Sequence, residues 1–147
     1  LAEEDKYKPQ HDFILTRSGV EVPLDMVKGA WLPKKYSNEW RFRSRYVWVD
    51  QISNGNWAIF WTKSKSKNEA IIFKTLPLSD ILLVEVGNVK LKKGGRPMMT
   101  MTSANAAACT LTIWLKTRER FSGIDIELPS VAKANEWKIV LEKLMKN

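Results

Sequence analysis

The feature that most constrains the fold of this chain is its division into short segments rich in Val, Ile, Thr and aromatic residues. Charged or Gly/Pro-containing stretches separate these segments about every ten residues, a spacing typical of an antiparallel sandwich or barrel. We therefore predict a mostly β fold with seven strands. Their expected positions are 27–32, 40–49, 57–63, 70–75, 81–86, 109–117 and 123–128.

The apolar period changes after Pro129. From there on, apolar side chains recur at intervals of three and four, which is the spacing of one face of an α-helix. The residues on that face are Ala134, Trp137, Val140, Leu141 and Leu144. We predict an amphipathic helix over 130–146, with Ser130 as its N-cap and its apolar face packed on the strands.

A chain of 147 residues with 44% hydrophobic residues can form one well-buried core but not two ordinary domains. We expect residues 1–26 to be an N-terminal extension and residues 27–147 to be the domain. A loop at 87–108 is long for a compact domain, and such loops are often functional or disordered.

Composition argues against an enzyme. The only cysteine is Cys109 and the only histidine is His11, which disfavours a disulfide, a Cys/His zinc site and a nucleophile with a separate histidine base. Carboxylate chemistry is compatible with these counts, but no paired-acid or nucleotide motif stands out, and Gly94-Gly95 lacks phosphate-loop spacing. We expect a non-enzymatic protein with no cofactor and no metal.

No apolar run approaches the ~20 residues of a membrane span. One cysteine is compatible with a reducing compartment, so we expect a cytoplasmic protein. The chain begins at Leu1 rather than Met, and we expect a natural segment upstream that could carry a targeting or lipid signal.

The positive charge is concentrated in one stretch. The chain has a formal net charge of +8, and residues 28–67 alone hold nine Lys or Arg and two acids. This distribution favours an anionic partner, which could be lipid headgroups, nucleic acid or an acidic protein surface.

Strand alternation makes residues 40–49 informative. Arg41, Arg43 and Arg45 share one face with two valines at 47 and 49, while the other face is mainly aromatic. Such a gradient suits a strand that begins at an open barrel mouth and ends in the core. We therefore expect Arg43 and Arg45 to point toward a pocket.

The order of these patterns resembles the pleckstrin homology (PH) domain family over about residues 27–146. The segments that carry the resemblance are Gly29-Ala30-Trp31-Leu32, Lys34-Lys35, Arg43 to Val49, Leu76 to Ile81 with Val84, Ile113 to Phe121, and Ala134 to Leu141 around Trp137. It implies a seven-stranded antiparallel barrel or sandwich capped by a C-terminal helix. The departures are the 87–108 insertion, the N-terminal extension and one extra residue after Trp40.

The resemblance also implies a headgroup site. In PH domains that bind phosphoinositides, a basic residue at the end of the first strand and a Lys/Arg-x-Arg on the second hold the phosphates. These positions correspond here to Lys34 or Lys35, and to Arg43 and Arg45. In this fold the loops at 33–39, 63–69 and 118–122 would meet at one rim. They would add Lys63, Lys65, Arg118 and Arg120 to the site. The alternative for Lys63 and Lys65 is that they only keep their loop solvated.

A second group of residues is expected to contact the membrane. Tyr36 and Trp40 lie in or beside the first hairpin loop, where they either insert as interfacial aromatics or pack against the loop. The long loop mixes cations with soft apolar side chains, which suits an anionic bilayer or a protein partner, or is a disordered insertion. Its candidate residues are Lys92, Lys93, Arg96, Met98 and Met99.

Three functions follow from these observations. The first is a peripheral module that binds anionic phospholipid, phosphatidic acid or phosphoinositide, and recruits or regulates at a membrane. A stand-alone basic domain of this size is also similar to the acylated PH-domain proteins of apicomplexan parasites, which sense phosphatidic acid in regulated secretion. The alternative is a protein-interaction scaffold that does not bind lipid.

The third function, binding of single-stranded nucleic acid, is disfavoured. Arg and Trp fall on opposite faces of 40–48, so they cannot build one stacking surface, and no RNP-like pattern is present.

Overall fold

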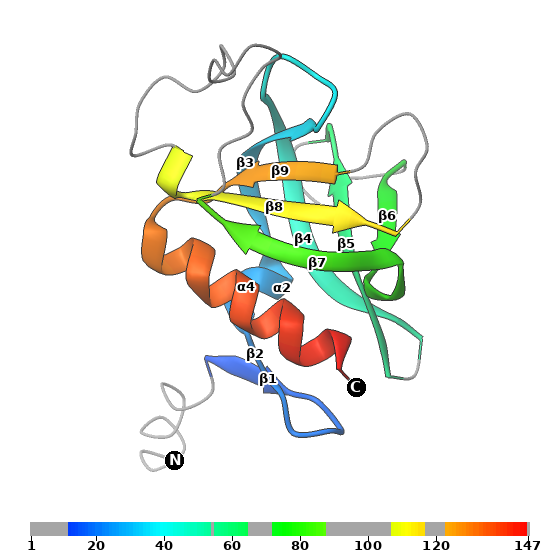
Figure 1. The fold of residues 1–147 in the computed structure, drawn as a ribbon. Coiled ribbons are helices and arrows are strands. Elements are labelled where there is room, and N and C mark those ends of the chain that lie inside the picture. Colours follow the sequence, from blue (N-terminus) through cyan, green and yellow to red (C-terminus); the bar gives the residue numbers. More distant parts are fainter. Residues whose placement is uncertain (1–11, 54, 65–71, 88–106, 117–122, 147) are drawn as a thin grey trace, which may run out of the picture.

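The computed structural model describes residues 12–53, 55–64, 72–87, 107–116 and 123–146. Seven of its strands form one antiparallel sheet in the order β6-β5-β4-β3-β9-β8-β7 (Figure 1). The strands are β3 (Ala30–Tyr36), β4 (Arg43–Ser53), β5 (Asn56–Thr62), β6 (Lys74–Pro77), β7 (Ile81–Val86), β8 (Thr110–Leu115) and β9 (Gly123–Glu127), with a 3₁₀ turn η2 (Leu78–Asp80) after β6. The mostly β, antiparallel, seven-stranded prediction is confirmed.

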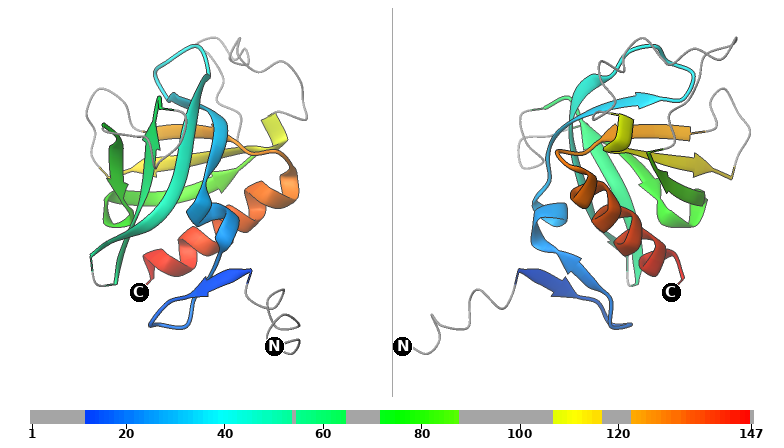
Figure 2. Two further views of the ribbon diagram at one scale, coloured as in Figure 1. Left: turned by 180° about the vertical axis from the view of Figure 1, so that it is seen from behind. Right: turned by 60° about the vertical axis from the view of Figure 1, so that its left-hand side comes forward.

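The sheet folds back on itself, with β3–β6 running across the direction of β7–β9 (Figures 1 and 2). The helix α4 (Val131–Met145) lies along β7 and β8 and closes the structure. Its buried face includes Trp137 and Leu141, and the Ser130 hydroxyl accepts a hydrogen bond from the Lys133 amide, as expected of the N-cap.

Successive side chains of β4 point to opposite faces of the sheet and pack in two separate clusters. Val47 and Val49 are fully buried and belong to the main core cluster, together with Ile59 of β5 and the apolar side chains of α4. The alternate residues pack on the outer face of the sheet, where Trp48 stacks on Phe60 with ring centroids 5.3 Å apart. This division is the one that the period of two predicts.

The chain upstream of β3 packs into the same core. It forms a small hairpin of β1 (Phe13–Leu15) and β2 (Glu21–Pro23), followed by the helix α2 (Leu24–Lys28). Val22 and Met26 are fully buried in the main core cluster. Residues upstream of β3 therefore contribute side chains to the same core as the strands.

Three strands are displaced from their predicted ranges, and the one expected at 40–49 is observed as Arg43–Ser53. The strand expected at 27–32 begins only at Ala30, because α2 continues to Lys28 and ends at Gly29. Gly29 has a φ of 85°, and a Cβ there would lie 2.7 Å from the Val47 carbonyl oxygen, so only glycine fits this turn. The strand expected at 70–75 is observed as Lys74–Pro77, beside β5.

None of the helices in the described ranges has the length and apolar character needed to cross a membrane.

Candidate anion-binding site

A pocket of about 600 Å³ opens where β3, β4, β5 and β6 come together near the β3–β4 hairpin. Five of its lining side chains are cationic and one is a carboxylate. The lining residues are Lys34, Tyr36, Glu39, Arg43, Arg45, Trp61, Thr62, Lys63, Ser64, Ile72 and Lys74. The excess of cations makes this hollow suitable for an anion.

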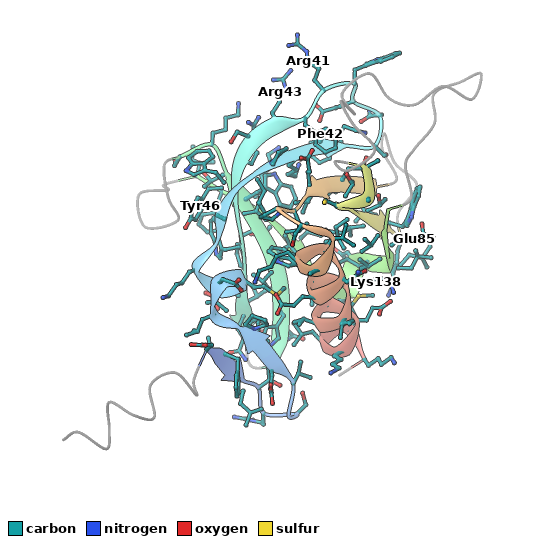
Figure 3. The ribbon with its side chains drawn as sticks, turned by 90° about the vertical axis from the view of Figure 1, so that its left-hand side faces the viewer. Arg41, Phe42, Arg43, Tyr46, Glu85 and Lys138 are labelled. Atoms are coloured by element: carbon teal, nitrogen blue, oxygen red, sulfur yellow. The ribbon has the colours of Figure 1, made fainter. Side chains whose placement is uncertain are left out.

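Strand register gathers the cations from residues far apart in sequence. Lys34 of β3 lies opposite Arg43 of β4, and Lys74 of β6 lies opposite Trp61 of β5. Arg43 and Arg45 alternate with outer-face residues, so both reach the pocket from the same side of β4. Figure 3 shows Arg43 near the hairpin end of the molecule, with Arg41 beyond it and Tyr46 farther along β4.

Lys34 lies at the base of the pocket and is only 5% exposed. Its Nζ is 3.8 Å from the centroid of the Tyr36 ring and 4.3 Å from that of the Trp61 ring. Burial lowers the pKa of Lys34 to about 7, Glu39 opposes that shift, and Arg45 and Lys74 add to it. An anion near this ammonium would favour its charged form.

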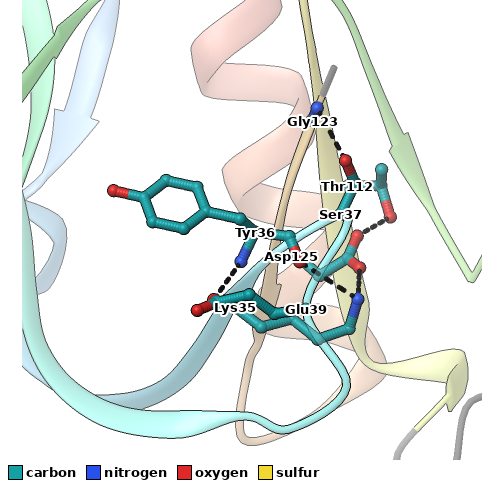
Figure 4. A network of polar contacts seen from close by, with 7 residues as sticks. All are labelled: Lys35, Tyr36, Ser37, Glu39, Thr112, Gly123 and Asp125. Atoms are coloured by element: carbon teal, nitrogen blue, oxygen red, sulfur yellow. Dashed lines mark hydrogen bonds and ion pairs between the residues drawn. The ribbon is translucent and has the colours of Figure 1, made fainter. Parts of the chain in front are cut away.

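The β3–β4 loop holds Tyr36 in the pocket wall. The Tyr36 amide donates to the Glu39 carboxylate at 2.9 Å (Figure 4). The Glu39 amide donates to the Tyr36 carbonyl at the same distance. Ser37 joins the loop to the start of β9 by two hydrogen bonds with the backbone of Gly123. The Tyr36 ring then meets Trp61 edge-on at 6.4 Å, so this tyrosine packs against the pocket, whereas Trp40 is exposed.

Lys35 does not belong to the pocket. Successive residues of a strand face opposite ways, and Lys35 is 1% exposed, with its Nζ 2.9 Å from Asp125 of β9. The Thr112 hydroxyl donates to the same carboxylate at 2.7 Å (Figure 4). Of the two lysines proposed for this position, the structure therefore brings only Lys34 to the arginines.

The remaining sequence candidates divide into two groups. Lys63 is exposed and lines the pocket beside Thr62. The other residues lie outside the described ranges: Lys65, Arg118 and Arg120 of the expected rim, and Lys92, Lys93, Arg96, Met98 and Met99 of the long loop.

Sequence reasoning missed Lys74 and Ile72. Lys74 is the first residue of β6, and Ile72 lies two residues before it. Their position at the pocket depends on how β6 pairs with β5, which local sequence does not determine.

No family model matches the chain, and no curated protein matches it. Several solved structures match the chain. PLC21 from S. officinalis superposes on 86% of this chain with a TM-score of 0.62 and 14% sequence identity. The match covers only 16% of the much longer PLC21 chain. A Slm1-PH domain structure, described as showing ligand binding in the non-canonical site, gives 0.54 at 12% identity over 81% of this chain and 96% of that one.

A second Slm1-PH structure, in complex with phosphoserine, gives a TM-score of 0.53 at 13% identity over 85% of this chain and all of that one. Inner Membrane Complex Sub-compartment Protein 1 from Toxoplasma gondii gives 0.52 at 12% identity, over 84% of this chain and 87% of that one. At these identities the comparisons concern the fold, and together with the strand order and closing helix they show that this chain has the pleckstrin homology fold.

Proposed function

We propose that this chain is a PH module that binds the anionic headgroup of a membrane phospholipid in the pocket around Lys34, Arg43 and Arg45. The observation that carries the proposal is the convergence of five cationic side chains on one hollow, with a single carboxylate among them. That carboxylate, Glu39, is engaged by the Tyr36 amide.

The side chains of the pocket have different roles in binding a phosphate. Arg43 and Arg45 present planar guanidinium groups that pair two donors with two phosphate oxygens. Lys34 supplies a point charge at the base, and Lys63 and Lys74 supply charges at the sides. Tyr36 and Trp61 exclude water around Lys34, which strengthens its interaction with an anion.

The fold comparison supports an anionic ligand in a general way, because a Slm1-PH domain has been solved with phosphoserine. Near an anionic membrane each basic group contributes roughly 1 kcal/mol, so this pocket would give reversible recruitment rather than permanent attachment. The proposed setting is therefore the surface of a membrane, at which the protein is peripheral.

The test is sedimentation with vesicles of phosphatidylcholine alone, or with added phosphatidic acid or a phosphoinositide at matched surface charge. The wild-type protein should sediment with at least one anionic composition and not with the neutral one. Arg43→Ala/Arg45→Ala should lose most of this binding. Which anionic vesicle binds more tightly identifies the headgroup class.

The matched control is Arg17→Ala/Lys146→Ala, which removes the same charge from exposed positions near β1–β2 and the end of α4 (Figure 1). Equal loss in both double variants would mean that net charge, not the pocket, drives binding. A wild-type protein that ignores every anionic vesicle would favour a protein-interaction scaffold instead.

A further inference from the structure

The rim of the pocket carries an apolar side chain that faces water. Ile72 lines the pocket and is 80% exposed, more than any other large apolar side chain in the described part of the chain. Its neighbour Phe73 is 47% exposed. Two exposed large apolar side chains are therefore adjacent in sequence here, and one of them lies at the pocket.

The structure holds both residues in place. The Ile72 carbonyl accepts a hydrogen bond from the Thr62 hydroxyl at 2.9 Å, which ties it to the end of β5. The Phe73 ring meets Phe60 and Trp48 edge-on, with centroids 5.6 and 5.9 Å away. Binding through a position that is already ordered costs little conformational entropy.

The surroundings of Ile72 are cationic. Lys63, Arg45 and Lys74 line the same pocket, so the apolar side chain stands among positive charges. An anionic bilayer surface complements such a mixture, because it presents phosphates above hydrocarbon.

We propose that Ile72 and Phe73 form an apolar lip that inserts between lipids while the adjacent cations hold a headgroup in the pocket. This inference rests on the proposed function and adds a second requirement to it. The partner is the bilayer surface rather than a free headgroup, so the protein should bind a lipid in a membrane more tightly than the same headgroup in solution.

Insertion is measured with an environment-sensitive fluorophore at position 72. The carrier is Ile72→Cys in a Cys109→Ser background, which leaves a single thiol for labelling. With vesicles of phosphatidylcholine and phosphatidic acid or phosphoinositide, the emission should shift to the blue and be quenched by lipids with a quencher on the acyl chain. The same label at Leu15→Cys is the control, since Leu15 is exposed on β1 at the far end of the molecule (Figure 1).

Affinity provides an independent measurement on unlabelled protein. Ile72→Ser should weaken vesicle binding by roughly tenfold, the low end expected for burying one large aliphatic side chain. Its binding of inositol trisphosphate or glycerol phosphate in solution should weaken much less than its vesicle binding. Leu15→Ser should change neither.

The outcomes separate the two proposals. The wild-type protein could bind vesicles while the label at position 72 stays in water and Ile72→Ser binds normally. In that case the insertion proposal is wrong, and the proposal of a headgroup pocket is unaffected. If wild-type protein binds no anionic vesicle, both proposals fail. If Ile72→Ser weakens vesicle and soluble headgroup binding equally, Ile72 shapes the pocket and does not insert.

Discussion

Lys34 and Lys35 are consecutive on β3 and both are almost fully buried, yet their surroundings differ. On one face, Lys35 forms an ion pair with Asp125, whose carboxylate also accepts a hydrogen bond from Thr112. On the other face, Lys34 lies against Tyr36 and Trp61, and within the described ranges no carboxylate is at ion-pair distance from it. The two positions therefore bury the same charge in different ways.

This difference separates a structural lysine from one suited to bind a ligand. The charge of Lys35 is already compensated inside the protein, so removing its partner would harm folding. Burial is the main cause of the lowered pKa of Lys34, and the nearby charge of Glu39 offsets it only in part. A buried cation that costs stability and gains on meeting an anion is typical of a binding site.

The largest expected effect concerns the compensated lysine. Asp125→Ala should lower the free energy of unfolding by about 3 kcal/mol, because it leaves a buried ammonium without its partner. Urea titration followed by circular dichroism measures it. Lys35→Met/Asp125→Leu, which removes both charges, should recover much of this loss. A single variant as stable as the wild type would show that Lys35 is not held by this pair.

Lys34→Met should have the opposite effect on stability. Removing a desolvated cation should raise the free energy of unfolding at neutral pH by about 1 kcal/mol, while vesicle binding falls roughly tenfold. The folded-state pKa of about 7 is below the ordinary 10.5, so this stability gain should shrink as pH rises from 7 toward 10.5. Thermal melts at several pH values, with vesicle sedimentation, measure both quantities. If Lys34→Met were less stable than the wild type, the burial of Lys34 would not be costly, and the contrast with Lys35 would be wrong.

Headgroup binding should depend on pH near neutrality. As pH rises through 7, Lys34 loses its proton in the free protein, whereas a bound anion favours the protonated form, so affinity should fall. Between about pH 6 and pH 8 the decrease should not exceed roughly tenfold. Measuring the wild type against Lys34→Met at each pH cancels the titration of the phosphate itself. A constant ratio between the two proteins would mean that Lys34 does not titrate in this range.

The smallest effect is expected at Glu39. Glu39→Gln keeps an oxygen that can accept from the Tyr36 amide but removes the one carboxylate from the pocket lining. Vesicle affinity should rise about threefold, a typical size for a partly screened like-charge interaction. The gain should fade at high salt. Glu127→Gln, on β9 and outside the pocket lining, is the matched control.

Much of this site could be predicted from one strand. Residues 43–49 alternate between basic or aliphatic and aromatic side chains, and a β-strand turns alternate residues to opposite faces. That rule is local, so it placed Arg43 and Arg45 on the same side as the core valines. It was less useful for β3, because the helix α2 moved the start of that strand to Ala30 and the choice between Lys34 and Lys35 depended on their surroundings.

The sequence by itself determined the mostly β fold, its closing helix and the basic face of β4, because all three follow from the period of apolar residues and the spacing of turns. Only the tertiary structure decided which lysine meets an acid, and that Lys74 and Ile72 reach the pocket. Asp125 is 90 residues from Lys35, and Lys74 lies opposite Trp61 only through the pairing of β5 with β6. Such contacts depend on strand register and sheet closure, which are set by the packing of the whole core rather than by neighbouring residues.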